Sequence, residues 1–112
     1  MEKSLCDSKC RVCEGGVSPF DVRTVDAYLK KIDANWQVNE VKTQITRVFE
    51  FKGFAKTMQF VNAIAWIANQ EMHHPDLEVS FNRCVVRLST HAIQGLSEND
   101  FVMAAKIDAL LA

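Results

Sequence analysis

The sequence lacks several features that mark whole classes of protein. Its 112 residues carry a formal net charge of −1 and no block of like charges, so we expect no nucleic-acid partner. No apolar run approaches the roughly 20 residues that a membrane-spanning helix needs, so we expect no membrane partner. The first residues, MEKSLCDSK, contain no apolar signal core, which predicts a cytoplasmic protein. There is no internal repeat, and the length suits one domain.

Cysteine is scarce over most of the chain and clustered at its start. Cys6, Cys10 and Cys13 stand close together, and Cys84 is far away, which is a poor disulfide framework. We therefore expect free thiols. The spacing of the first three is compatible with an iron–sulfur cluster, although the chain is too short for the barrel that such cluster enzymes need. A partial zinc site is also open, although no fourth ligand is evident. We interpret residues 1–17 as an irregular, cysteine-containing arm and residues 18–112 as a single domain.

Periodic apolar residues predict three helices and four strands after the arm. Ser18-Pro19-Phe20-Asp21 predicts a helix start with Ser18 as its cap, and the helix should end near residues 33–35. A long helix is predicted from Phe54 to Met72, where Pro75 forces it to stop, and a capping box of Ser97 and Asp100 opens the last helix. Alternating apolar residues predict strands at 36–41, 44–51, 77–81 and 84–89.

The resulting order, α-β-β-α-β-β-α, predicts an α+β fold with a four-stranded antiparallel sheet and helices packed on one of its faces. The open face and the edge strands favour self-association. Trp66 is interpreted as a core or subunit-interface residue. The apolar positions predicted to form the buried stripe of the long helix are Phe54, Met58, Val61, Ile64, Ala65 and Ala68, widened by Phe60, Ile67 and Met72.

The chemistry of the chain is concentrated in its three histidines. His73 and His74 stand where the long helix ends, and His91 follows the last strand. If the two intervening strands pair as a hairpin, their outer ends meet, and all three imidazoles lie at one rim of the sheet. Because histidine titrates near neutral pH, neighbouring imidazoles can divide into acid and base.

Two other interpretations of the histidines stay open. They can be structural residues that bond carbonyl groups at the ends of a helix and a strand. They can also hold a catalytic zinc ion, which accepts three histidine ligands. Zinc is disfavoured because adjacent residues such as His73 and His74 rarely point at one ion, and no histidine pair stands four residues apart.

A family resemblance spans nearly the whole chain. The residues that carry it are His73-His74-Pro75-Asp76, Leu88-Ser89-Thr90-His91, Gly95-Leu96-Ser97 with Asp100, and upstream Trp36, the stretch from Phe49 to Phe54, and Cys13-Glu14-Gly15-Gly16. In these motifs and their spacing the chain resembles the pterin-4a-carbinolamine dehydratase family, also known as the dimerisation cofactor of a homeodomain transcription factor.

The resemblance implies dehydration of a 4a-hydroxy-tetrahydropterin to quinonoid dihydropterin and water, by acid/base catalysis without cofactor or metal. His73, His74 and His91 are then the catalytic set, with His74 as acid and His73 or His91 as base. It also implies a homodimer or homotetramer, and relatives that act as binding or assembly modules give the alternative function. The substrate-binding residues that it implies are Met72, Ser89, Thr90, Ala92 and Asp100.

Overall fold

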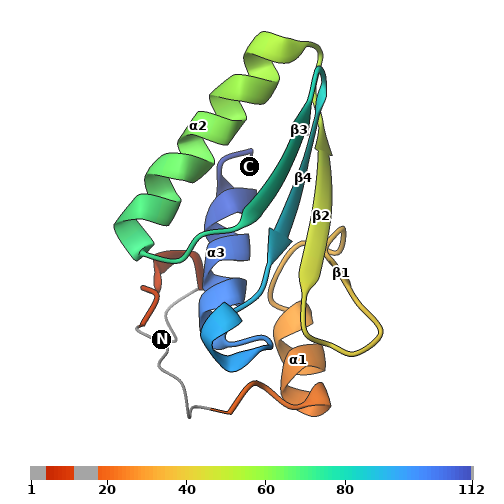
Figure 1. The fold of residues 1–112 in the computed structure, drawn as a ribbon, viewed down its shortest axis with the longest axis vertical. Coiled ribbons are helices and arrows are strands. Elements are labelled where there is room, and N and C mark those ends of the chain that lie inside the picture. Colours follow the sequence, from red (N-terminus) through yellow and green to blue (C-terminus); the bar gives the residue numbers. More distant parts are fainter. Residues whose placement is uncertain (1–4, 12–17, 112) are drawn as a thin grey trace.

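The computed structural model describes residues 5–11 and 18–111. Its three α-helices and four strands follow the predicted order, so the α+β prediction is confirmed (Figure 1). The elements are η1 (Leu5–Asp7), α1 (Val22–Leu29), β1 (Gln37–Val38), β2 (Ile45–Glu50), α2 (Phe54–Glu71), β3 (Asp76–Ser80), β4 (Arg83–Leu88), η2 (His91–Ile93) and α3 (Glu98–Ala109).

The sheet has the strand order β1-β2-β4-β3, with every neighbouring pair antiparallel. Directly paired residues share a face, so the register Phe49↔Cys84↔Val79 extends one face across three strands. On the central strands this face is apolar and buried, as Ile45, Phe49 and Cys84 show. The alternation predicted for residues 44–51 is therefore confirmed.

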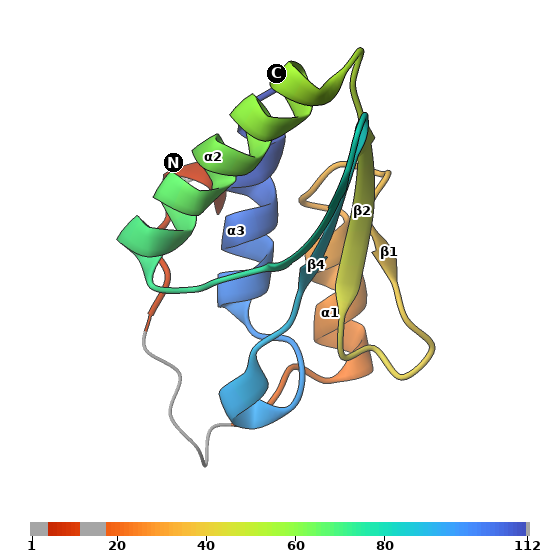
Figure 2. The same cartoon turned by 45° about the horizontal axis from the view of Figure 1, so that its top comes forward.

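Helices α2 and α3 lie along the same side of the sheet (Figures 1 and 2), and α1 contacts α3. The helices and the inner sheet face enclose one apolar core, whose fully buried side chains include Val25, Ile45, Ile64, Leu88 and Phe101. Among the described residues, none of the helices is both long and apolar enough to cross a membrane.

The first helix begins later than the sequence predicted. Asp21 is its capping residue, and its carboxylate accepts a hydrogen bond from the Thr24 backbone N–H at 2.8 Å. Ser18 lies three residues before this cap. The Phe20 N–H donates to the Leu96 carbonyl at 2.8 Å and so holds the entering chain against the loop before α3. The helix also ends at Leu29, earlier than the predicted residues 33–35.

The prediction of the buried stripe of α2 was partly wrong. Ile64 and Ala68 are buried as expected, but Phe54 and Ala65 are exposed. Phe60, predicted to widen the stripe, is buried, and Thr57, which was not predicted, also takes an inward position. Thr57 is fully buried although it is polar. Its hydroxyl is satisfied because it donates to the carbonyls of Gly53 and Phe81.

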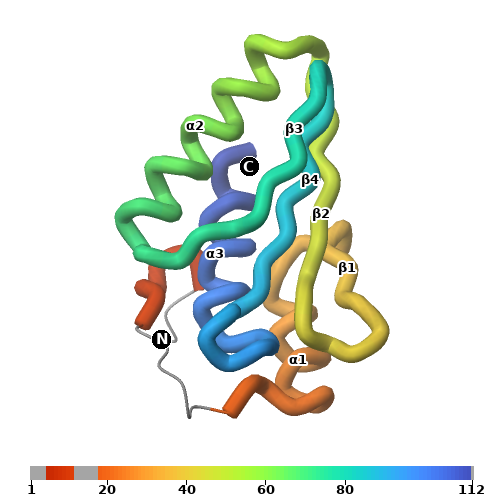
Figure 3. Tube along the Cα trace, viewed as in Figure 1, coloured from red at the N-terminus to blue at the C-terminus, as the bar shows by residue number. Residues whose placement is uncertain are grey.

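Part of the predicted arm is packed against the domain. Residues 5–11 contain the short helix η1, which contacts α3, and the Lys106 ammonium donates to the Cys6 carbonyl at 2.8 Å. Figure 3 shows this segment between the end of α2 and α3. Cys13, with the glycines that follow it, lies outside the described residues.

Candidate active site

A cavity of about 480 Å³ opens where α2 ends and where β4 runs into η2. It unites the three histidines, as the hairpin argument predicted. A larger hollow of about 720 Å³ beside α1 contains no histidine. The residues that line the histidine cavity are Arg11, Met72, His73, His74, Ser89, Thr90, His91, Ala92 and Asn99.

The end of α2 sets the position of the histidine pair. Met72 caps the helix in the left-handed conformation, with φ 53°, and its N–H donates to the Ala68 carbonyl. The His73 N–H donates to the same carbonyl at 3.3 Å. The chain therefore turns sharply out of the helix, and Pro75 prevents the helix from continuing.

His73 is held by a buried carboxylate. Its Nε2 lies 2.7 Å from Asp100 Oδ1, and Asp100 is fully buried near the start of α3. The second oxygen, Oδ2, accepts from the Thr90 hydroxyl at 2.8 Å and from the Ser97 N–H at 3.0 Å. The Ser97–Asp100 capping box predicted from the sequence is present. One carboxylate thus ties the start of α3, the end of β4 and the His73 imidazole together.

His74 and His91 are more open to solvent. His74 Nε2 lies 3.3 Å from the Asn69 side-chain oxygen, one turn back on α2. His91 begins η2 with its side chain 76% exposed, and its Nε2 is 4.0 Å from Asp76 Oδ2. The site therefore combines one fixed, mostly buried imidazole with two accessible ones.

The residues predicted to bind substrate fall into two groups. Met72, Ser89, Thr90 and Ala92 line the cavity. Asp100 does not line it but lies behind His73.

Two lining residues, Arg11 and Asn99, were not predicted from the sequence. No periodicity or motif could have found Arg11, because it reaches the cavity through hydrogen bonds between the arm and the domain.

The metal hypotheses gain no geometric support from residues 5–11 and 18–111. Within those ranges, no three histidine, cysteine or acidic side chains are grouped so that they could hold an ion. Cys6 and Cys84 are free thiols there. The cluster hypothesis also needs Cys13, which lies outside the described residues.

Comparison with known proteins gives a consistent result. Residues 18–110 match the family model "Pterin 4 alpha carbinolamine dehydratase". Proteins provisionally named pterin-4-alpha-carbinolamine dehydratase are 50% identical in Nitrosomonas eutropha, over 96% of this chain and 93% of that one, and 49% identical in Legionella pneumophila, over 99% and 98%.

A solved structure shares the fold. It is a transcriptional coactivator/pterin dehydratase from Brucella melitensis, with a TM-score of 0.79 and 32% identity over 85% of this chain and all of that one. The family match covers most of the chain, and it includes all three histidines of the cavity. This chain belongs to the pterin-4a-carbinolamine dehydratase family.

Proposed function

We propose that this chain catalyses the dehydration of a 4a-hydroxy-tetrahydropterin to quinonoid dihydropterin and water. In the reaction a ring N–H proton is removed, the nitrogen's electron pair forms a double bond to C4a, and the C4a–OH bond breaks as the hydroxyl is protonated. The observation that carries the proposal is the convergence of three imidazoles on one cavity of about 480 Å³. Cavities of this size accept small molecules.

The two proton transfers are assigned to different histidines. We assign the Nε2 proton of His73 to its contact with the Asp100 carboxylate 2.7 Å away. This assignment leaves Nδ1 of that ring as the basic nitrogen and supports His73 as the base. The accessible His74 is proposed as the acid at the departing hydroxyl, and His91, which lines the same cavity, is proposed to assist. Both steps are proton transfers, so the proposed reaction needs no metal or redox cofactor.

The reaction has a natural place after pterin-dependent hydroxylation of aromatic amino acids, which leaves the 4a-hydroxy species. The enzyme would then return this product towards the tetrahydropterin cofactor. Backbone groups of Ser89 and Ala92, which line the cavity, are proposed to hold the ring.

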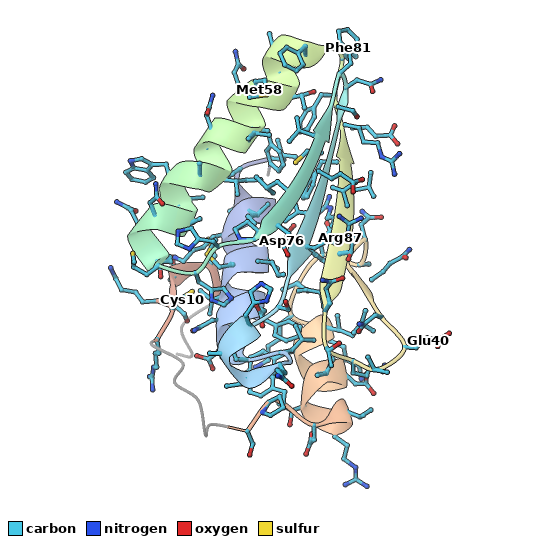
Figure 4. The ribbon with its side chains drawn as sticks, viewed as in Figure 1. Cys10, Glu40, Met58, Asp76, Phe81 and Arg87 are labelled. Atoms are coloured by element: carbon cyan, nitrogen blue, oxygen red, sulfur yellow. The ribbon has the colours of Figure 1, made fainter. Side chains whose placement is uncertain are left out.

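A coupled hydroxylase assay tests the proposal. The pure protein should accelerate loss of the 4a-hydroxy species, and His74→Ala should lower this rate about 100-fold because it removes the acid. Glu40→Ala, in the loop between β1 and β2, is the matched control and should keep full activity (Figure 4). Full activity in His74→Ala would refute the assignment of the acid, and an inactive wild-type protein would favour the binding-module alternative.

A further inference from the structure

The arm places a guanidinium beside the catalytic cavity. Arg11 lies outside residues 18–110, the part of the chain that matches the family model, yet it lines the cavity with the three histidines. We propose that Arg11 is a substrate-binding residue that makes the site prefer pterins with an anionic side chain. This inference rests on the proposed function, because it concerns the substrate of the same site.

The backbone of Arg11 is fixed at the cavity. Its N–H donates to the Asn99 side-chain oxygen at 2.8 Å, and its carbonyl accepts from the Asn99 side-chain amide. Asn99 is itself buried, with 5% of its surface exposed. One residue earlier, the Cys10 N–H donates to Glu71 Oε1 at 2.8 Å.

These bonds join the arm to both elements that carry the site. Glu71 is the last residue of α2, two residues before His73, and Asn99 adjoins Asp100 on α3. Figure 4 shows Cys10 near the end of α2. The backbone of Arg11 is therefore fixed at the cavity, and its side chain takes no part in these hydrogen bonds.

The charges around Arg11 favour an anion. None of the cavity-lining residues is acidic. Two carboxylates near the site are engaged by other groups, since Glu71 accepts the Cys10 N–H at 2.8 Å and Asp100 bonds His73. Among the described residues, no carboxylate lies within ion-pair distance of the exposed Arg11 guanidinium.

The Arg11 guanidinium is better suited to bind an anionic pterin side chain than the neutral pterin ring. Arginine offers five N–H donors and no acceptor, and it pairs best with carboxylate or phosphate oxygens. The pterin ring is neutral, and its polar edge mixes donors with acceptors, so it matches a donor-only group incompletely. A carboxylate or phosphate on the side chain, near the exposed mouth of the cavity, would match it fully.

Fluorescence titration with two stable oxidised pterins tests the inference. Pterin-6-carboxylate carries the anion, and 6-hydroxymethylpterin is its neutral counterpart. The wild type should bind the carboxylate more tightly. Arg11→Gln should weaken carboxylate binding about fivefold and change binding of the neutral pterin less than about twofold, because an exposed ion pair contributes modestly.

Lys9→Gln is the matched control, since it removes an equal charge from an exposed position two residues away. It should leave both affinities unchanged. Equal losses in Lys9→Gln and Arg11→Gln, or equal weakening of both pterins by Arg11→Gln, would overturn the role of Arg11 while leaving the dehydratase proposal intact. A wild type that binds neither pterin would overturn both.

Discussion

Asp100 has the most connected side chain in the site. One carboxylate oxygen faces His73, and the other accepts from Thr90 and Ser97. A buried carboxylate is costly unless such donors satisfy it, and here three groups do so. Its position also links the helix cap of α3 to the orientation of an imidazole, so a single residue serves both stability and proton transfer.

Asp100→Asn should separate these two roles. The amide is nearly isosteric, but its NH₂ group can donate to His73 Nε2 and so favour the other imidazole tautomer. We expect kcat to fall about 10- to 100-fold while the far-ultraviolet circular dichroism keeps its helical signal. Nitrogen chemical shifts of His73 in an NMR spectrum would report the tautomer directly.

Asp26→Asn is the control for Asp100→Asn. It removes the same charge from an exposed residue of α1 that pairs with Lys42 at 3.0 Å and does not line the cavity. Its kcat should equal that of the wild type. If Asp100→Asn lost only stability, with kcat and the His73 tautomer unchanged, Asp100 would be a cap and not a positioning residue.

At the scale of elements, the junction between α2 and the histidine pair is strained. Met72 takes a left-handed conformation with φ 53°, which costs a residue with a Cβ about 1 kcal/mol and glycine almost nothing. Gln94, just after η2, has a similar φ of 54°. Strained residues thus stand at the end of each element that presents a histidine, which is where function tends to retain strain.

Replacing Met72 by glycine should relieve this strain. Its side chain is 78% exposed, so little packing is lost, and we expect the free energy of unfolding to rise by about 0.5–1 kcal/mol in urea titrations. Met72→Ala is the control because alanine keeps the strained Cβ and should give no increase. A gain of equal size in both variants would show that the backbone is not the cause.

The sequence predicts where helices and strands begin and end better than it predicts which of their faces is buried. Period-two alternation located β2 to within one residue at each end, and the capping box at Ser97 located α3. The stripe of α2 was misplaced because apolar residues surround much of that helix, so periodicity alone does not say which direction is inward. The position of Arg11 at the cavity could not be predicted from the sequence, because it depends on hydrogen bonds to Asn99 that leave no periodic pattern.

At the scale of the whole molecule, some apolar residues of the predicted α2 stripe face away from the core. Phe54, Met58 and Ala65 form an apolar line rotated about 90° from the direction in which α2 faces the core, while Val61 packs against the core. Phe54 is 53% exposed and Ala65 is also exposed, and Trp66, about 100° further round the helix, is 65% exposed. An apolar line of this kind on a surface helix usually marks an interface.

We therefore expect the protein to form a homo-oligomer through α2, and a charge placed on that line should disrupt it. Ala65→Glu adds a carboxylate at an exposed position, so it should spare the fold of the single chain but bury an unpaired charge between subunits. Sedimentation equilibrium should give a multiple of 12.7 kDa for the wild type and a value near 12.7 kDa for Ala65→Glu. Gln70→Glu adds the same charge to another exposed side of α2 and should keep the wild-type mass. A monomeric wild type, or an unchanged mass in Ala65→Glu, would mean that this face of α2 is not the interface.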